Sequence, residues 1–220
     1  MIIVAIDEIS FSKASAIVDK LDHKKCMIKV GSVAFNSCGH KLIAYASEKG
    51  FGIFLDLKLH DIPNTVQKSI EGLISLPIKM LTIHTSGGKE MMMAAMQAVK
   101  ETNIKIFGVT ALTSLGDQDT NEIFRRNASK QVEVMLDLAQ SSGIHGVVCS
   151  PKELDLVSQR KSLLSITPGI RLHESDDDQK RVMTPKEAIK LGADYIVIGR
   201  PITSSKNINK TLNEIYSSIK

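Results

Sequence analysis

The chain has 220 residues, 43% of them hydrophobic, which is enough to bury one substantial core and argues against a disordered protein. Lysine and arginine total 28 against 24 aspartate and glutamate residues, and this excess of +4 is spread along the chain, so we expect no nucleic-acid groove. No apolar run approaches the ~20 residues of a membrane-spanning helix, so we expect no membrane contact.

The cysteines and the N-terminus point to the compartment. Cys26, Cys38 and Cys149 lie far apart and form no Cys-x-x-Cys pair, so neither a disulfide framework nor a zinc site is indicated. The opening residues MIIVAIDE contain no basic leader, and their apolar run is too short for a signal peptide. We therefore expect a cytoplasmic protein with reduced thiols.

Eight short apolar runs rich in β-branched residues predict strands. They cover residues 2–6, 26–30, 52–57, 79–83, 105–109, 146–150, 163–167 and 195–199. Segments with helical spacing lie between them, at 11–21, 41–49, 89–101, 130–143 and 184–192. The last segment begins Thr-Pro-x-Glu and ends in glycine, which are typical signals for the start and the end of a helix.

This alternation of elements predicts the fold class. Strands that are apolar on both faces and alternate with helices indicate a parallel sheet covered on both sides. Eight units of about 27 residues match a compact (β/α)8 barrel, or TIM barrel. A doubly wound open sheet is the alternative, but no Gly-x-Gly-x-x-Gly follows the first strand. Since no linker divides the chain, we predict an α/β protein in which residues 1–220 form a single (β/α)8-barrel domain.

Charged residues lie at the ends of the first three predicted strands, where a TIM barrel places its active site. They are Asp7, Lys29 and Asp56, and Lys58 lies two residues beyond Asp56, so that a regular strand turns both side chains into the barrel. Lys29, Asp56, Lys58 and Asp61 then form a row of alternating charge, and each neighbour favours the ionised form of the next. We therefore predict a protonated Lys58 that delivers a proton, rather than a free amine for Schiff-base chemistry. The alternative is an ion-pair network that only holds the barrel mouth together.

The end of the last predicted strand, Gly199 and Arg200 followed by a proline, predicts a phosphate site. Glycine lets a ligand approach the backbone, a helix start offers free N–H groups, and arginine adds a bidentate charge. Arg171 comes from the preceding strand end, and Gln179 lies in the polar loop 168–184. A polar loop of this length is either a lid or a mobile insertion, and we favour a lid. No group of residues has the spacing of metal ligands, so we expect no metal.

Specific motifs run along nearly the whole chain. They are VAID, IKVG, FLDLKLHDIPNTV, HTSGG, VTALTS, GVVCS, TPGIR, DQKRVMTP and YIVIGRPIT. In these motifs the chain resembles the bacterial-type orotidine 5′-monophosphate decarboxylases. The Asp-x-Lys-x-x-Asp core is shared by a wider superfamily, whereas HDIPNT together with TPGIR and IGRPIT is highly specific. The resemblance implies a homodimeric carboxy-lyase that converts orotidine 5′-monophosphate to uridine 5′-monophosphate, the last step of de novo pyrimidine nucleotide biosynthesis, without a metal or an organic cofactor.

The resemblance also implies roles for individual residues. Lys58 protonates C6, Asp56 faces the departing CO2, and Asp61 enters the site from the partner subunit. Lys29 and Asp7 bind ribose hydroxyls and order the charged row. Further substrate-binding residues that the resemblance implies are Ile62 and Thr65, Thr113 and Ser114 near the pyrimidine, and Arg171, Gln179, Gly199 and Arg200 at the phosphate, with residues 170–184 closing over it.

Two alternative functions stay open at the level of sequence. The first is a magnesium-dependent sugar-phosphate lyase or decarboxylase of the same superfamily. By resemblance, such enzymes carry a glutamate metal ligand at the position of Lys29, where a cation repels a metal. The second is a barrel that binds a nucleotide without catalysis, which nothing in the charged row favours.

Overall fold

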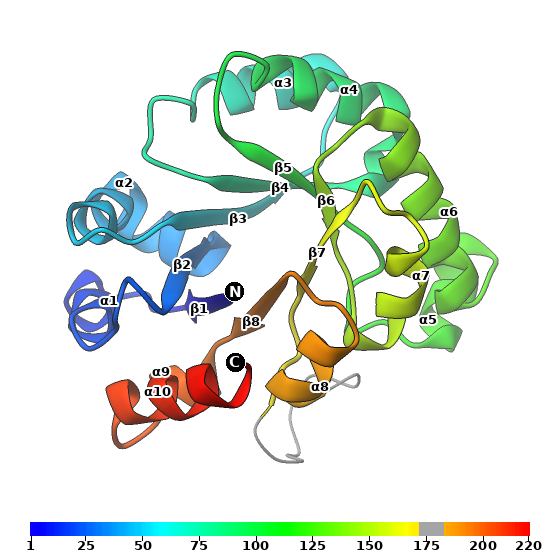
Figure 1. Ribbon diagram of the computed structural model, residues 1–220. Coiled ribbons are helices and arrows are strands. Elements are labelled where there is room, and N and C mark those ends of the chain that lie inside the picture. Colours follow the sequence, from blue (N-terminus) through cyan, green and yellow to red (C-terminus); the bar gives the residue numbers. More distant parts are fainter. Residues whose placement is uncertain (172–182) are drawn as a thin grey trace.

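Eight parallel strands close into a barrel in chain order, with the last strand pairing back to the first. The computed structural model describes residues 1–171 and 183–220. The strands are β1 Ile2–Ile6, β2 Cys26–Gly31, β3 Ile53–Leu59, β4 Met80–His84, β5 Lys105–Val109, β6 Gly146–Val148, β7 Leu164–Thr167 and β8 Tyr195–Ile198. Helices surround the strands, as Figure 1 shows. The predicted (β/α)8 barrel is confirmed.

The helices follow the strands. They are α1 Phe11–Val18, α2 Ser32–Glu48, α3 Pro63–Glu71, α4 Gly88–Ala98, α5 Asp117–Phe124, α6 Ala128–Ser142, α7 Leu154–Ser158, α8 Pro185–Lys190, α9 Arg200–Thr203 and α10 Ile208–Ser218, with short 3-10 turns at η1 Thr85–Gly87 and η2 Pro151–Glu153. The predicted start of α8 is confirmed, because the Thr184 side chain accepts a hydrogen bond from the Glu187 N–H. The short helix α7 escaped prediction because its five residues bury only Leu154 and Val157, too few to show a helical period.

Two apolar layers lie on the two sides of the barrel wall. In β1, Ile3 and Ala5 belong to the cluster inside the barrel, whereas Ile2 and Val4 belong to the larger cluster between the strands and the helices. The inner cluster also contains the fully buried rings of Phe54 and Phe107, which meet edge to face. Burying one large apolar side chain stabilises the fold by about 1.5–3 kcal/mol. These layers explain why the strands read as continuous apolar runs.

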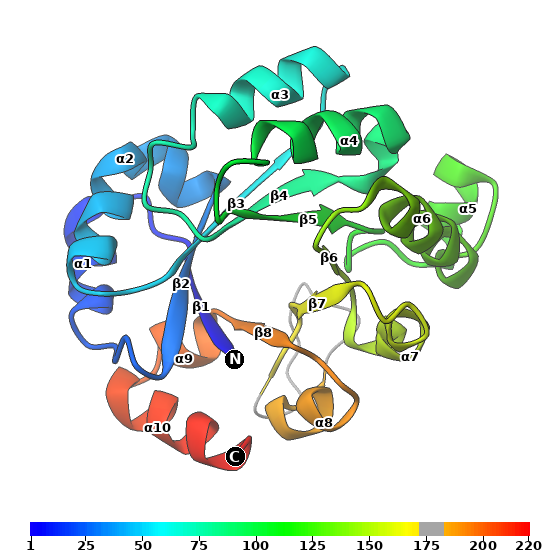
Figure 2. The same ribbon diagram turned by 45° about the horizontal axis from the view of Figure 1, so that its top comes forward.

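A hydrogen bond joins two strand starts at the base of the barrel. The amino group of Met1 donates a hydrogen bond to the Asp194 carbonyl at 2.8 Å, which ties the start of β1 to the loop before β8. Both chain ends lie on this side of the molecule (Figure 2). The charged row lies at the opposite, carboxyl ends of the strands, where a TIM barrel places its active site.

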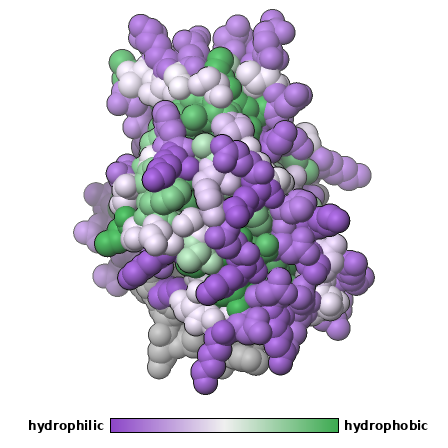
Figure 3. All heavy atoms as spheres, turned by 90° about the vertical axis from the view of Figure 1, so that its left-hand side faces the viewer, coloured by the Kyte–Doolittle hydropathy of each residue, from purple (hydrophilic) through white to green (hydrophobic). Residues whose placement is uncertain are grey.

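The outside of the molecule is mostly hydrophilic. Figure 3 shows hydrophilic side chains over most of one face, with smaller hydrophobic areas between them. Within the part of the chain that the structure describes, no helix is both long enough and apolar enough to cross a membrane.

Candidate active site

A cavity of about 290 Å³ opens at the carboxyl ends of the strands. Its charged lining residues are Asp7, Lys29, Asp56, Lys58, Arg171 and Arg200. Its apolar lining includes Phe54, Val109, Leu112, Val148 and Val197. The charged side chains therefore lie next to an apolar surface that is continuous with the inner cluster. Such an apolar surface weakens the screening of charge by water.

One carboxylate lies between two ammonium groups. Asp56 Oδ2 is 2.8 Å from Lys58 Nζ and 3.4 Å from Lys29 Nζ. Lys29 Nζ is also 3.2 Å from Asp7 Oδ1. Asp56 is 7% exposed, so its charge is nearly buried and depends on these cations for compensation. The predicted contacts of Asp56 with Lys29 and Lys58 are thus confirmed, and Asp7 extends the row beyond Lys29. Asp61, the predicted last member of the row, is exposed and does not line the cavity.

The pKa of Asp56 reflects this competition. Burial raises the pKa of the carboxyl, but the charges of Lys29 and Lys58 and hydrogen bonds from Lys58 and Thr82 outweigh burial and lower the pKa below its ordinary value. Asp56 is therefore a fixed negative charge at neutral pH. A substrate carboxylate placed beside it meets repulsion, while an ammonium placed beside it is attracted.

Lys58 reaches the cavity by a different route from the one predicted. Its φ is 53°, in the left-handed region, and the pairing of β3 with β4 shifts register between Leu55 and Leu59. Simple alternation along a regular strand therefore explains the inward direction of Asp56 but not that of Lys58. The side chain still lies beside Asp56, because the bulge turns it back toward the cavity.

Gly31 makes room for the other lysine. A Cβ atom at this position would lie 2.8 Å from Lys29 Nζ and 3.4 Å from Asp7 Oδ1. The missing side chain therefore leaves the space in which the Lys29 ammonium bridges Asp7 and Asp56. Sequence reasoning used the glycine only as part of a motif.

Three of the residues predicted for a phosphate line the cavity. They are Arg171, after β7, and Gly199 and Arg200, after β8, and Gly169 lines it as well. Arg171 is 9% exposed, and its guanidinium donates to the Ile170 carbonyl at 3.1 Å. The helix after Gly199 is the single turn α9. Two arginines in the lining give the cavity the positive charge that a phosphate requires.

Comparisons with known proteins place this site in a family. Residues 1–215 match the model of the family described as "Orotidine 5'-phosphate decarboxylase / HUMPS family". The chain belongs to this family. Relatives named orotidine 5′-phosphate decarboxylase include those of Wolbachia pipientis subsp. Culex pipiens and Ehrlichia canis, each 44% identical over 99% of this chain and covering 98% and 97% of the relative.

A solved member has the same fold over the whole chain. The crystal structure of orotidine 5′-phosphate decarboxylase from Lactobacillus acidophilus superposes with a TM-score of 0.88 at 32% identity, and the match covers 100% of this chain and 98% of that one. The resemblance inferred from the motifs is therefore confirmed at the level of family and fold.

Not every residue that the family resemblance implied lies in the cavity of this chain. Thr113 lines it, whereas its neighbour Ser114 is exposed outside the lining. Asp61, Ile62 and Thr65 are exposed on the β3–α3 loop and the start of α3, and the Asp61 carboxylate accepts a hydrogen bond from the Ile62 N–H at 2.7 Å. Gln179 and most of the 170–184 segment lie outside the described residues.

Several cavity residues were not predicted from the sequence. The apolar floor was assigned to strands without a role in the site, and Cys149 was treated only as a reduced thiol. Cys149 lines the cavity, and burial followed by the charge of Glu153 raises the pKa of its thiol well above the ordinary value. A neutral thiol is a poor nucleophile, so Cys149 serves as an apolar wall. In the described part of the chain, no three His, Cys, Asp or Glu residues are grouped so that they could hold a metal ion.

Proposed function

We propose that the chain converts orotidine 5′-monophosphate to uridine 5′-monophosphate, as the last step of pyrimidine nucleotide biosynthesis, with residues 1–220 acting as one domain. The observation that carries this proposal is the Asp56 carboxylate between Lys29 and Lys58 in a cavity that two arginines also line. Membership in the decarboxylase family and the names of its relatives support the reaction.

The chemistry follows from the charges. The bond from C6 to the carboxylate breaks, CO2 leaves, and the electron pair remains on C6. The Lys58 ammonium stabilises this developing negative charge and then gives its proton to C6, which forms the new C–H bond. A cation already oriented by Asp56 does this with little reorganisation, unlike mobile water. Solvent returns a proton to Lys58 before the next turnover.

The remaining proposed roles concern binding. Asp7 and Lys29 bind ribose hydroxyls, Thr113 and Ser114 contact the pyrimidine, and Arg171 and Arg200 hold the phosphate beside Gly199. Gln179 and residues 170–184 complete this end of the site. Binding energy from the distant phosphate then favours the reactive arrangement at C6.

A homodimer completes the site in this proposal. Asp61 lies on the surface beside Ile62, whose exposed fraction is 66%, and Thr65 follows on α3. An exposed isoleucine next to an exposed carboxylate suits a loop that packs against a second copy of the chain, and there Asp61 reaches the partner's site. We also propose a cytoplasmic location, in keeping with the free thiols of all three cysteines.

The test is loss of the orotate chromophore on mixing substrate with protein, with and without a strong chelator. Activity in the presence of chelator supports the proposal, while activity that chelator abolishes and magnesium restores supports the magnesium-dependent alternative. Substrate that binds with unchanged absorbance supports a nucleotide sensor.

The matched variants are Lys58→Ala and Lys130→Ala. Lys58→Ala should lower turnover by at least about 10⁴-fold, since both the proton donor and the oriented charge are removed, while binding of uridine 5′-monophosphate persists. Lys130 is exposed on α6 and pairs with Glu133 at 2.7 Å, so its removal should leave turnover unchanged. Near-normal turnover in Lys58→Ala would rule out Lys58 as the acid.

A further inference from the structure

The pairing between β3 and β4 is interrupted beside the charged row. Leu55 pairs with Leu81 and Leu59 pairs with Ile83, so four steps along β3 correspond to two steps along β4. Thr82 is therefore the single β4 residue opposite three residues of β3, Asp56 to Lys58. Lys58 occupies the left-handed region in this gap, a conformation that costs a non-glycine residue of order 1 kcal/mol or more. Something must hold the bulge in place.

The Thr82 hydroxyl occupies the gap. Its Oγ1 accepts a hydrogen bond from the backbone N–H of Lys58 at 2.9 Å and donates one to Asp56 Oδ1 at 2.9 Å. The direction is fixed, because an ionised carboxylate only accepts and an amide N–H only donates. Thr82 is fully buried, so water does not substitute for either bond. One hydroxyl thus replaces the missing ladder contact and restrains the Asp56 carboxylate.

These bonds divide the two oxygens of Asp56 between different partners. Oδ1 faces Thr82 on the buried side, while Oδ2 receives Lys58 Nζ at 2.8 Å and Lys29 Nζ at 3.4 Å. Rotation of the carboxylate would break the Thr82 bond, so the orientation of Oδ2 toward both ammonium groups is fixed. The same hydroxyl holds the backbone from which the Lys58 side chain starts. The Thr82 hydroxyl therefore restrains both residues of the Asp56–Lys58 ion pair.

We infer that Thr82 is a positioning residue for the decarboxylation. Its one hydroxyl fixes the orientation of the Asp56 carboxylate and the position of the Lys58 backbone, although Thr82 does not line the substrate cavity. This inference rests on the proposed function. Misplacement of a reacting group by about 1 Å costs on the order of 10²-fold in rate. The loss should fall on the chemical step, because the phosphate and ribose contacts come from other strands.

The test compares three variants at Thr82 with a matched threonine. Thr82→Val keeps the shape and removes both hydrogen bonds, whereas Thr82→Ser keeps a hydroxyl that makes both. Thr85 is also fully buried, and its hydroxyl donates to the Val109 carbonyl of β5 at 2.7 Å instead of to the charged row, so Thr85→Val controls for the loss of a buried hydroxyl. Thr82→Ala covers the case in which valine does not fold.

We expect Thr82→Val to lower kcat by about 10²-fold, with KM and the affinity for uridine 5′-monophosphate within about three-fold of wild type. Thr82→Ser should keep kcat within about five-fold, and Thr85→Val should match wild type. A kcat for Thr82→Val within three-fold of wild type, an equal loss in Thr85→Val, or failure of both Thr82→Val and Thr82→Ala to fold would overturn the inference. An inactive wild-type protein would instead refute the proposed function.

Discussion

Replacing Asp56 with asparagine removes the charge that compensates two lysines while keeping the shape of the side chain and an oxygen for Thr82. The two contacts of 2.8 and 3.4 Å to Asp56 Oδ2 each correspond to about 5–6 kcal/mol of attraction at an effective dielectric constant of ~20. Desolvation of the three charges offsets much of this attraction. Lys29 also keeps Asp7 at 3.2 Å, and the Lys58 side chain is 35% exposed, so water relieves part of the loss. We expect Asp56→Asn to lower the free energy of unfolding by about 2–4 kcal/mol at pH 7.

The pH dependence of this loss has a defined sign. The folded-state pKa of Asp56 lies below that of an unfolded aspartate, about 3.9. Its stabilising contribution is therefore complete above the unfolded value and disappears as the pH falls through the lower folded value. The difference in the free energy of unfolding between wild type and Asp56→Asn should be constant from about pH 5 to 7 and should shrink below about pH 4.

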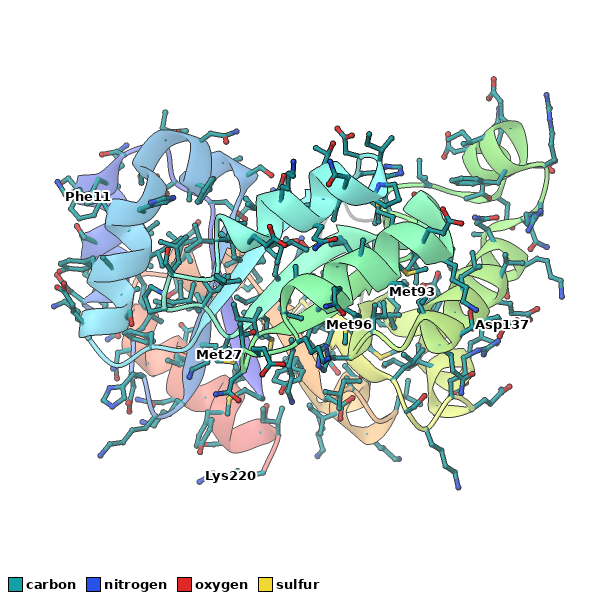
Figure 4. All side chains as sticks on the ribbon, turned by 90° about the horizontal axis from the view of Figure 1, so that it is seen from above. Phe11, Met27, Met93, Met96, Asp137 and Lys220 are labelled. Carbon is teal, nitrogen blue, oxygen red and sulfur yellow. The ribbon has the colours of Figure 1, made fainter. Side chains whose placement is uncertain are left out.

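The measurement is urea unfolding followed by circular dichroism at several pH values. A loss of about 3 kcal/mol shifts the urea midpoint by roughly 1 M at pH 7. Asp137→Asn is the control, because Asp137 pairs with Arg160 at 2.7 Å but its side chain is 68% exposed, and it lies at the edge of the molecule (Figure 4). Its effect should stay within about 1 kcal/mol. An unchanged or higher midpoint for Asp56→Asn, or a difference that grows on acidification, would refute the electrostatic reasoning.

Two further predictions concern substrate binding and assembly. Arg200→Ala should weaken binding of uridine 5′-monophosphate by about 10- to 100-fold and leave the weak binding of uridine unchanged, because only the phosphate loses a charge-assisted partner. Calorimetry with both ligands measures the two affinities. Equal losses of affinity for both ligands would contradict the prediction. Mixing inactive Lys58→Ala and Asp61→Ala subunits should restore about a quarter of wild-type activity, because half of the dimers are mixed and each mixed dimer has one intact site. Continued inactivity of subunits that do exchange would show that Asp61 does not act across an interface.

The sequence predicted those parts of the site that depend on the two-residue alternation of side chains along a single strand. Apolar runs separated by helical segments were sufficient for a parallel sheet covered on both faces. The number of units, eight of about 27 residues, favoured a barrel over a doubly wound sheet. The same period places Asp7, Lys29 and Asp56 inside the barrel, because each follows inward-facing positions of its strand. Closure in chain order then brings the ends of neighbouring strands together.

The parts that sequence missed depend on contacts between strands. Thr82 carries the only hydroxyl in the apolar run MLTIH, and its hydrogen-bond partners lie on β3. The pattern of residues within its own strand therefore predicts no role for it. Its place in an apolar strand was the available signal, because a buried hydroxyl needs a partner. The position of Lys58 was predicted from alternation, whereas the left-handed bulge decides it.

By itself, the sequence determined that eight apolar strands would form a covered parallel sheet and that their ends would carry alternating charge, because both follow from the local periods of burial and polarity. Only the tertiary structure decided which oxygen of Asp56 each lysine contacts, how Gly31 makes room for an ammonium, and where β3 breaks its register with β4. Those features depend on distances between segments that are far apart along the chain, and no local period contains them.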